Sequence, residues 1–195
     1  DGMSVLIETA LNRLSPYRIE ALKSITESGR ASDASSLALE LMKDTNFDIR
    51  LAAFEQLHKL NDKAITAKLI ASVFYIERIE QTVGKDIYVT RSGQPKVVLF
   101  GSTINFNKGF LVTSVNGEIA IEAPEDKDYV IVTRKFPNRP DLTGQIKCSY
   151  EIGDIIQALC DALPERGQQN RGGLGVSYSD LIALLKQMCD KGAVN

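Results

Sequence analysis

The chain repeats one stretch near its start, with YRIEALKSI at residues 17–25 followed by IRLAAFEQL at residues 49–57. The offset between the two copies is constant, so that Arg18 corresponds to Arg50 and Ala21 to Ala53. A turn signal precedes each stretch, and apolar residues recur at every third or fourth position, which is typical of an amphipathic helix. Both stretches are therefore predicted to be helices with one buried face.

A second helix is predicted after each of these, over residues 34–42 and 64–73. The same offset relates Leu37 to Leu69, so the register of the repeat is expected to continue through the second pair. Two helices per copy, with an arginine soon after the turn, resemble repeats of the HEAT type, although the period is short for that class. An unrelated helical bundle is the alternative.

The opening segment, residues 3–14, is predicted to be a helix that fits the second half of an earlier copy, because Val5 corresponds to Leu37. Stacked helix pairs share a continuous core and need a cap where they stop. We therefore expect residues 1–73 to be HEAT-like repeats and a fragment of a longer array.

At Phe74 the apolar pattern changes from a helical period to alternation, and β-branched and aromatic residues become frequent. Turn residues at 92–95 and 115–117 separate neighbouring strands. Residues 137–141 contain two prolines and are predicted to be a loop. The predicted strands of this mainly antiparallel segment are residues 74–79, 86–91, 96–100, 109–113, 118–121, 129–134 and 145–150.

Two helices are predicted at the end of the chain, over about residues 151–163 and 177–191. Ser177 with Asp180 three positions later approximates a capping box, and Gly192 is well placed to end the second helix. The expected fold class is α+β. Its first domain is 1–73, and its second, 74–195, is a β-rich domain closed by the two helices.

Composition excludes several classes of function. Of the 195 residues, 23 are Lys or Arg and 25 are Asp or Glu, giving a formal charge of −2 with no basic region for nucleic acid. A single histidine removes most metal sites and most histidine-based catalysis. No apolar run reaches the roughly 20 residues that a membrane-spanning helix needs.

Each residue or motif that could form a metal, phosphate or acid–base site is better interpreted as ordinary surface structure. His58 is expected to be a solvated or partly packed surface residue, because no second histidine is available to share a metal. Gly172–Gly175 lacks the Lys-Ser/Thr pair of a phosphate-binding loop and is expected to be a solvated loop. The charged residues 125–128 are expected to be a solvated turn.

Three cysteines are too few and too scattered for a disulfide framework. Cys160 and Cys189 fall on predicted helices and are expected to be small core residues, while a disulfide or a reactive role for these or Cys148 is the alternative. No catalytic, cofactor-binding or metal-binding residue is assigned. No cofactor and no small-molecule substrate is expected, and an enzyme is the weakest of the hypotheses.

The C-terminal half resembles the flagellar basal-body P-ring family. The stretch DIIQALCDAL at residues 154–163 is similar to the family's penultimate helix, and DLIALLKQM at 180–188 with GA at 192–193 is similar to its last. The stretch VTRSGQPKVVLFG at 89–101 is similar to a variant in which strands follow a helical-repeat insert.

This resemblance implies a non-catalytic, periplasmic subunit of a bushing around the flagellar rod, which works by self-association and by contacts with rod or ring proteins. The apolar faces of the last two helices are either a ring contact or part of the chain's own core. A HEAT-repeat scaffold unrelated to flagella, binding a partner through residues 1–73, is the alternative function.

Overall fold

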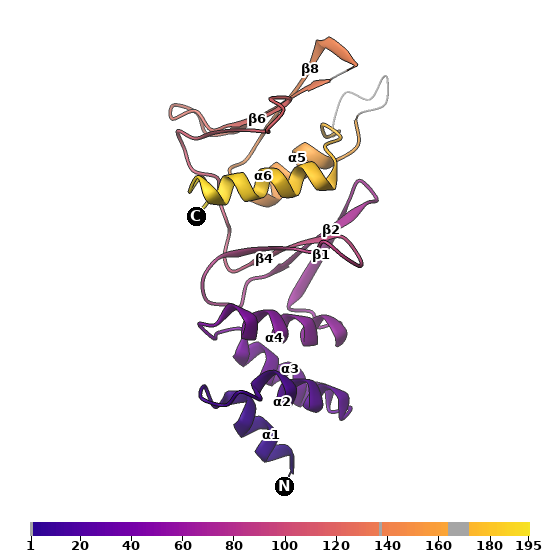
Figure 1. The fold of residues 1–195 in the computed structure, drawn as a ribbon, viewed down its shortest axis with the longest axis vertical. Coiled ribbons are helices and arrows are strands. Elements are labelled where there is room, and N and C mark those ends of the chain that lie inside the picture. The colour runs from indigo at the N-terminus through magenta and orange to yellow at the C-terminus, as the bar shows by residue number, and fades with distance from the viewer. Residues whose placement is uncertain (1, 137, 164–171) are drawn as a thin grey trace. The chain divides into compact units, whose positions relative to one another are not determined.

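The computed structural model describes residues 2–136, 138–163 and 172–195. Within those ranges the chain has six helices and two four-stranded sheets, which confirms the α+β class (Figure 1). The described residues divide into two compact units. Unit 1 comprises those within 1–67, 77–87 and 98–102, and unit 2 comprises those within 68–76, 88–97 and 103–195.

Unit 1 begins with four helices, as predicted. They are α1 (Gly2–Leu11), α2 (Arg18–Glu27), α3 (Ala31–Leu41) and α4 (Phe47–Lys59), and Figure 1 shows them following one another as layers. Asn46 begins α4 because its side chain accepts a hydrogen bond from the amide of Asp48 at 2.9 Å. The apolar faces meet in one core, which includes Ala21, Leu22, Ile25, Leu37, Ala38, Ala53, Phe54 and Leu57.

The constant offset between the two copies also relates the ends of α2 and α4. The C-caps of the two helices are Ser28 and Leu60. The next residue in each case, Gly29 or Asn61, has a positive φ, of 80° and 49° respectively. Glycine and asparagine are the residues that most readily adopt this conformation after a helix. The two copies therefore share the geometry with which the chain leaves the helix.

The helix predicted over residues 64–73 is wrong. These residues instead form β1 (Ile65–Ile70) and the turn that leads to β2 (Phe74–Ile79). Isoleucine and threonine favour the extended chain here. Leu69, the counterpart of the buried Leu37, is exposed on β1.

The turn between β1 and β2 carries no recognisable signal in the sequence. Ala71 and Ser72 both have positive φ, of 50° and 58°, and the amide of Val73 donates to the carbonyl of Ile70 at 2.9 Å. These are the features of a type I′ hairpin turn, which Asn-Gly usually forms. Ala-Ser is an unusual sequence for it, so the amphipathic pattern alone favoured a helix.

The remaining strands of the first sheet confirm two predictions. They are β3 (Asp86–Val89) and β4 (Lys96–Phe100), and the strand order is β1-β2-β4-β3. Gly93, with φ of 72°, lies in the turn between β3 and β4. Within unit 1, the Phe100 ring packs edge-on against Phe54 and Phe47 of α4, at centroid distances of 5.3 and 5.6 Å.

The second sheet lies within unit 2 and is antiparallel. Its strands are β5 (Leu111–Thr113), β6 (Ile119–Glu122), β7 (Val130–Phe136) and β8 (Arg139–Cys148), in chain order. All four were predicted, with different ends. The alternating side chains on its inner face are buried, among them Val112, Ile119, Ile121, Val130 and Val132.

The loop predicted over residues 137–141 is wrong for its last three residues, because β8 already begins at Arg139. Residue 137 lies outside the described residues. The register of β7 against β8 shifts between Lys135 and Phe136, where the strands turn. β8 is an edge strand of this sheet, and an edge tolerates proline because one side of the strand needs no partner.

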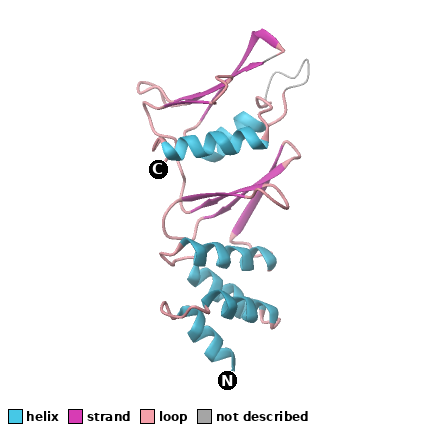
Figure 2. Cartoon of the chain, viewed as in Figure 1, coloured by secondary structure: helices cyan, strands magenta, loops and turns pink. Residues whose placement is uncertain are grey.

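Two helices complete unit 2, as predicted. They are α5 (Ile152–Cys160) and α6 (Tyr178–Asp190), and both lie along one face of the second sheet (Figure 2). The Ser177 side chain accepts the amide of Asp180 at 3.2 Å and caps α6. Gly192 follows the helix with φ of 65°, as expected. Among the described residues, no helix is both long and apolar enough to cross a membrane.

Candidate functional site

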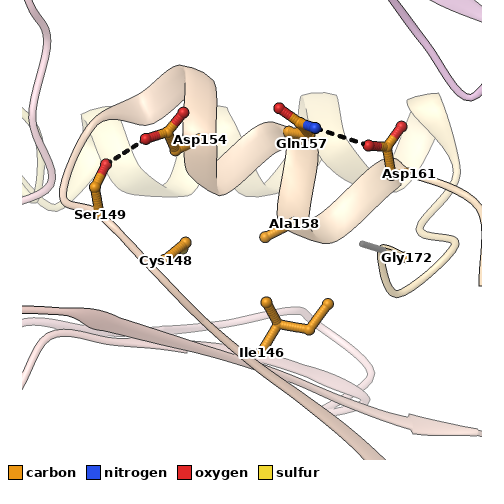
Figure 3. Close-up of a pocket in the computed structure, with 8 residues that line it drawn as sticks. All are labelled: Ile146, Cys148, Ser149, Asp154, Gln157, Ala158, Asp161 and Gly172. Atoms are coloured by element: carbon orange, nitrogen blue, oxygen red, sulfur yellow. Dashed lines mark hydrogen bonds between the residues drawn. The ribbon is translucent and has the colours of Figure 1, made fainter. Parts of the chain in front are cut away.

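One open pocket lies between the edge strand β8 and helix α5, and it encloses about 380 Å³ (Figure 3). Residues at positions 154, 157 and 158 recur at helical spacing, so α5 presents them on one face, and Asp161 follows directly as the C-cap of the helix. β8 and the residues that follow it supply the opposite wall. The lining residues are Ile146, Cys148, Ser149, Asp154, Gln157, Ala158, Asp161 and Gly172.

The polar groups of this pocket are already paired with one another. The Ser149 hydroxyl donates to Asp154 Oδ2 at 2.6 Å, and Gln157 Nε2 donates to Asp161 Oδ2 at 3.0 Å (Figure 3). Lys68 Nζ donates to Gln157 Oε1. The carboxylates therefore accept hydrogen bonds from neutral side chains.

Cys148 supplies the thiol in the described lining of the pocket, and its environment makes it unreactive. Burial, with a smaller contribution from the charge of Asp154, raises the pKa of Cys148 to about 12. The nucleophile is the thiolate, so this cysteine is overwhelmingly the neutral thiol at pH 7. The described lining therefore offers a ligand hydrogen-bond acceptors and a protonated thiol.

The glycine-rich segment Gly172–Gly175 has a structural role, and the prediction of a solvated loop is wrong for its centre. Gly173 and Leu174 are buried. Their amides donate to the carbonyls of Ala162 and Ala158, at 2.8 and 2.9 Å. A Cβ on Gly173 would lie 2.4 Å from the carbonyl oxygen of Asp161. The segment thus closes the C-terminal end of α5, and these amides are not available to a phosphate.

His58 lies half-exposed on α4, which agrees with a partly packed surface residue. Its Nε2 is 3.0 Å from Oε1 of Glu77, a buried carboxylate on β2. Sequence reasoning did not identify Glu77, because nothing in the chain indicates which strand lies against α4. Among the described residues, no group of three or more His, Cys, Asp or Glu side chains is arranged to hold a metal ion.

The three thiols are free in this structure. Cys160 is buried, as predicted for a core residue, whereas Cys189 is exposed and the same prediction for it is wrong. Position 189 lies on α6 next to the buried Met188 but on the outer face of the helix. The charged residues 125–128 form a solvated turn, as predicted, in which Lys127 pairs with Asp126 at 2.9 Å.

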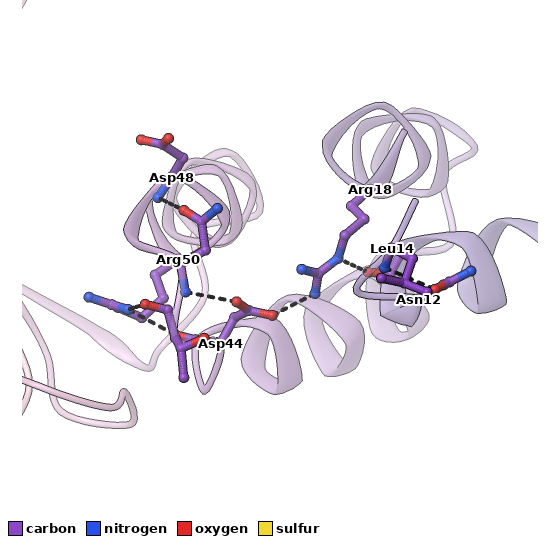
Figure 4. Close-up of polar contacts among 9 residues, drawn as sticks. Asn12, Leu14, Arg18, Asp44, Asp48 and Arg50 are labelled. Atoms are coloured by element: carbon purple, nitrogen blue, oxygen red, sulfur yellow. Dashed lines mark hydrogen bonds and ion pairs between the residues drawn. The ribbon is translucent and has the colours of Figure 1, made fainter. Parts of the chain in front are cut away.

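A second group of interacting side chains lies within unit 1 and follows the repeat (Figure 4). Arg18, buried at the start of α2, donates through Nη2 to Asp44 Oδ2 at 2.6 Å and through Nε to the carbonyl of Ala10 at 2.9 Å. Arg50, at the equivalent position of α4, donates to the carbonyl of Asp44 at 2.8 Å and to the carboxylate of Asp86. Each arginine thus joins its helix to a neighbouring turn.

The turns that these arginines face are also equivalent. The Asp44 side chain accepts the amide of Asn46 at 2.8 Å, and the Asn12 side chain accepts the amide of Leu14 at 3.0 Å (Figure 4). Asn12 and Asp44 occupy equivalent positions of the two copies, and each fixes the turn that follows it. The contacts of Asp44 and the two arginines tie the helical layers together, which is a structural role.

Several large apolar side chains of unit 1 are exposed near its first helix. Helix α1 has one charged residue, Glu8, and its only buried residue is Ala10. Large apolar side chains on α1 and on the turn after it are exposed, although isolated exposed apolar residues are common on proteins. We call this the α1 surface, and its exposed members are Val5, Leu11, Leu14 and Tyr17.

Comparison with protein families, with curated proteins and with solved structures found no match to this chain.

Proposed function

We propose that this chain is a non-catalytic structural protein that works by self-association and by contacts with other protein chains. The observation that carries this proposal is the α1 surface, where several large apolar side chains remain in contact with water. Large apolar side chains in contact with water are available to pack against another protein.

The specific form of the proposal is a periplasmic subunit of the flagellar P-ring kind, with no nucleic acid and no small molecule as partner. The resemblance of residues 154–163 and 180–193 to the end of that family supports it. The apolar residues of those stretches are buried between α5, α6 and the second sheet, among them Ile155, Ile156, Leu159, Leu181, Leu184 and Leu185. These residues build the chain's own core, so a ring contact would use other surfaces.

A HEAT-like scaffold unrelated to flagella is the second candidate. The helical repetition favours it, since the constant offset relates Asn12 to Asp44 and Gly29 to Asn61 in geometry as well as in sequence. Stacked helical repeats typically bind partners along an extended surface. In this case the chain would be a monomer that binds a distinct protein through its helical repeats.

Two measurements separate the candidates. Sedimentation of the purified chain over a range of concentrations tests self-association, and fractionation of cells tests whether it accompanies flagellar basal bodies. A P-ring-like subunit associates with itself and is found in the basal-body fraction. A scaffold remains monomeric, and its capture of a defined partner is abolished when residues 1–73 are deleted. A monomer that neither binds a partner nor enters that fraction contradicts both.

A further inference from the structure

We propose that the α1 surface binds an amphipathic helix that packs on α1 and α2 as α2 packs on α3 and α4. This inference rests on the proposed function, because it supposes that the chain works through protein contacts. It adds the place of contact and the kind of partner. The evidence lies in the differences between each position of the first copy and its counterpart in the second.

The two copies have equivalent backbones around this surface. Helix α1 corresponds to α3, and α2 corresponds to α4, with the turns at Asn12 and Asp44 held by the same side-chain-to-amide hydrogen bond. In the second copy, α2 lies against both α3 and α4. In the first copy, no described helix occupies the corresponding place on α1 and α2.

The burial of equivalent side chains differs between the two copies in the same way. Val5 is 61% exposed, and its counterpart Leu37 is 6% exposed. Tyr17 is 67% exposed, and its counterpart Ile49 is 8% exposed. At these two positions the first copy has thus kept apolar residues that the second copy buries. Leu11 and Leu14 correspond instead to the exposed Lys43 and Asn46, so the inferred contact is centred on Val5 and Tyr17.

A third pair of equivalent positions shows the same difference in exposure between the two copies. Leu6 is partly exposed on α1, whereas its counterpart Ala38 is fully buried. Exposed apolar side chains on a helix can pack against the apolar face of another helix, which is the mode of recognition used in helix-in-groove binding.

The residue equivalent to Asp44 restricts which side chains the partner helix can carry at its start. Asp44 forms an ion pair with Arg18 of the helix that covers it, but Asn12, its counterpart, is uncharged. A carboxylate is therefore absent where a covering helix would place its arginine. The occupant we infer is a helix with an aliphatic face like that of α2 and without a need for a buried ion pair at its start.

The test extends the full chain at its N-terminus with a second copy of residues 13–32, joined directly to Asp1 and carrying Arg18→Ala in the added copy, because Asn12 offers that arginine no carboxylate. Asp1 corresponds to Asp33, so the added helix enters in the register of α2. Hydrogen exchange of the α1 amides is the readout, since covering the surface makes local opening rarer. The matched control carries Leu22→Ser and Ile25→Ser in the added copy only, which removes its apolar face and keeps its length.

We expect exchange of the α1 amides to slow by about tenfold or more in the extended chain and to be unchanged in the control, because burying one large side chain corresponds to about this factor. Equal exchange in both chains overturns the inference. The peptide of residues 13–32 with Arg18→Ala, added to the unextended chain, gives an independent readout. Amide shifts confined to α1, α2 and the turn between them support the inference, and shifts that are absent or lie elsewhere contradict it.

A further variant separates this inference from the proposed function. Val5→Asp in the extended chain should restore the fast exchange of α1 if the added helix lies where we place it. Persistence of slow exchange in that variant overturns the inference. Sedimentation of the unextended chain reports self-association independently, so a failed test of the α1 surface leaves that result unaffected.

Discussion

Arg18 and Asp44 form a buried ion pair, in which Nη2 and Oδ2 are 2.6 Å apart and both side chains are almost excluded from water. The pair joins the start of α2 to the turn before α4, two segments well separated in the chain. Removing one partner of such a pair leaves the other charge buried, which is more destabilising than the loss of an exposed pair. This contact is therefore expected to be a principal determinant of the stability of the helical layers.

Asp44→Ala is predicted to lower the free energy of unfolding by about 3–5 kcal/mol, because it leaves the Arg18 guanidinium buried without a carboxylate and removes the turn. Asp44→Asn should lower it by about 1.5–3 kcal/mol, since asparagine preserves the turn as Asn12 does. Urea unfolding measures both values. The control is Glu40→Ala, which removes the exposed pair with Lys43 and should change stability by less than about 1 kcal/mol.

The stability of the chain is predicted to fall at acid pH through Asp44 and Asp62. Burial raises the pKa of Asp44, but the hydrogen bond from the Asn46 amide and the pair with Arg18 outweigh it, so the pKa is lowered. A hydrogen bond from Ser35 and another from the Ala64 amide lower the pKa of Asp62.

A carboxyl group whose pKa is lower in the folded chain stabilises it above the unfolded pKa, and this contribution is lost as the pH falls through the folded pKa. The contribution of Asp44 should therefore be constant from pH 7 to about pH 5 and decline below about pH 4. Between pH 5 and pH 2, Asp44→Asn should lose less stability than the parent chain. Equal losses in the two chains would contradict the assignment.

Replacing the β1–β2 turn with Ala71→Asn and Ser72→Gly is predicted to raise the free energy of unfolding by about 1–2 kcal/mol. Both positions have positive φ, which Asn and Gly adopt with less strain than Ala and Ser. Thermal or urea unfolding checks this value. The control is Ala183→Asn on the exposed face of α6, which should instead lower stability by about 0.5 kcal/mol. A loss of stability in the turn variant would show that this hairpin is misassigned.

Gly173→Ala is predicted to destabilise the chain by about 1–3 kcal/mol, because the added Cβ would lie against the backbone of Asp161, which cannot move aside as a flexible side chain can. Gly2→Ala is the control, since nothing lies within 4 Å of a Cβ there. It should be neutral or slightly stabilising in α1. If both variants unfold at the same urea concentration, Gly173 does not close α5 as described.

Alkylation of the native chain at pH 8 is predicted to modify Cys189 first and Cys160 last. Cys189 is exposed, whereas Cys160 is buried, and burial followed by the charge of Asp161 raises the pKa of Cys160 to about 12. Mass spectrometry of timed samples measures the order, and unfolding in urea should remove the difference. Cys160 reacting as fast as Cys189 in the folded chain would be inconsistent with the packing of α5.

The sequence was sufficient to predict six helices, because apolar side chains recurred at helical spacing and Asn46, Ser177 and Gly192 marked helix ends. The prediction failed at residues 64–73, where the spacing of apolar residues was compatible with either a helix or a strand. There the deciding feature was a type I′ turn formed by Ala71 and Ser72, which have no strong preference for it. It also failed at residues 139–141, because proline excludes a central strand but allows an edge strand, and sequence does not reveal the order of a sheet.

The candidate site was less predictable than the fold. The α5 residues of the pocket could be placed on one helix face, but their proximity to Cys148 depends on how β8 lies against α5. Glu77 and Asp86 are paired with His58 and Arg50, respectively, across segments whose contact no local pattern specifies. The α1 surface, in contrast, follows from comparing the two copies, once the burial of Leu37 and Ile49 is known.

We propose above all that this chain works by associating with other copies of itself and with other proteins. Sedimentation equilibrium of the purified chain, from low to high concentration, is the decisive measurement. We expect the weight-average mass to rise above the monomer mass of 21.4 kDa as the concentration increases. A mass that stays at the monomer value at the highest concentration, in a chain that is also missing from the basal-body fraction, would contradict the proposal.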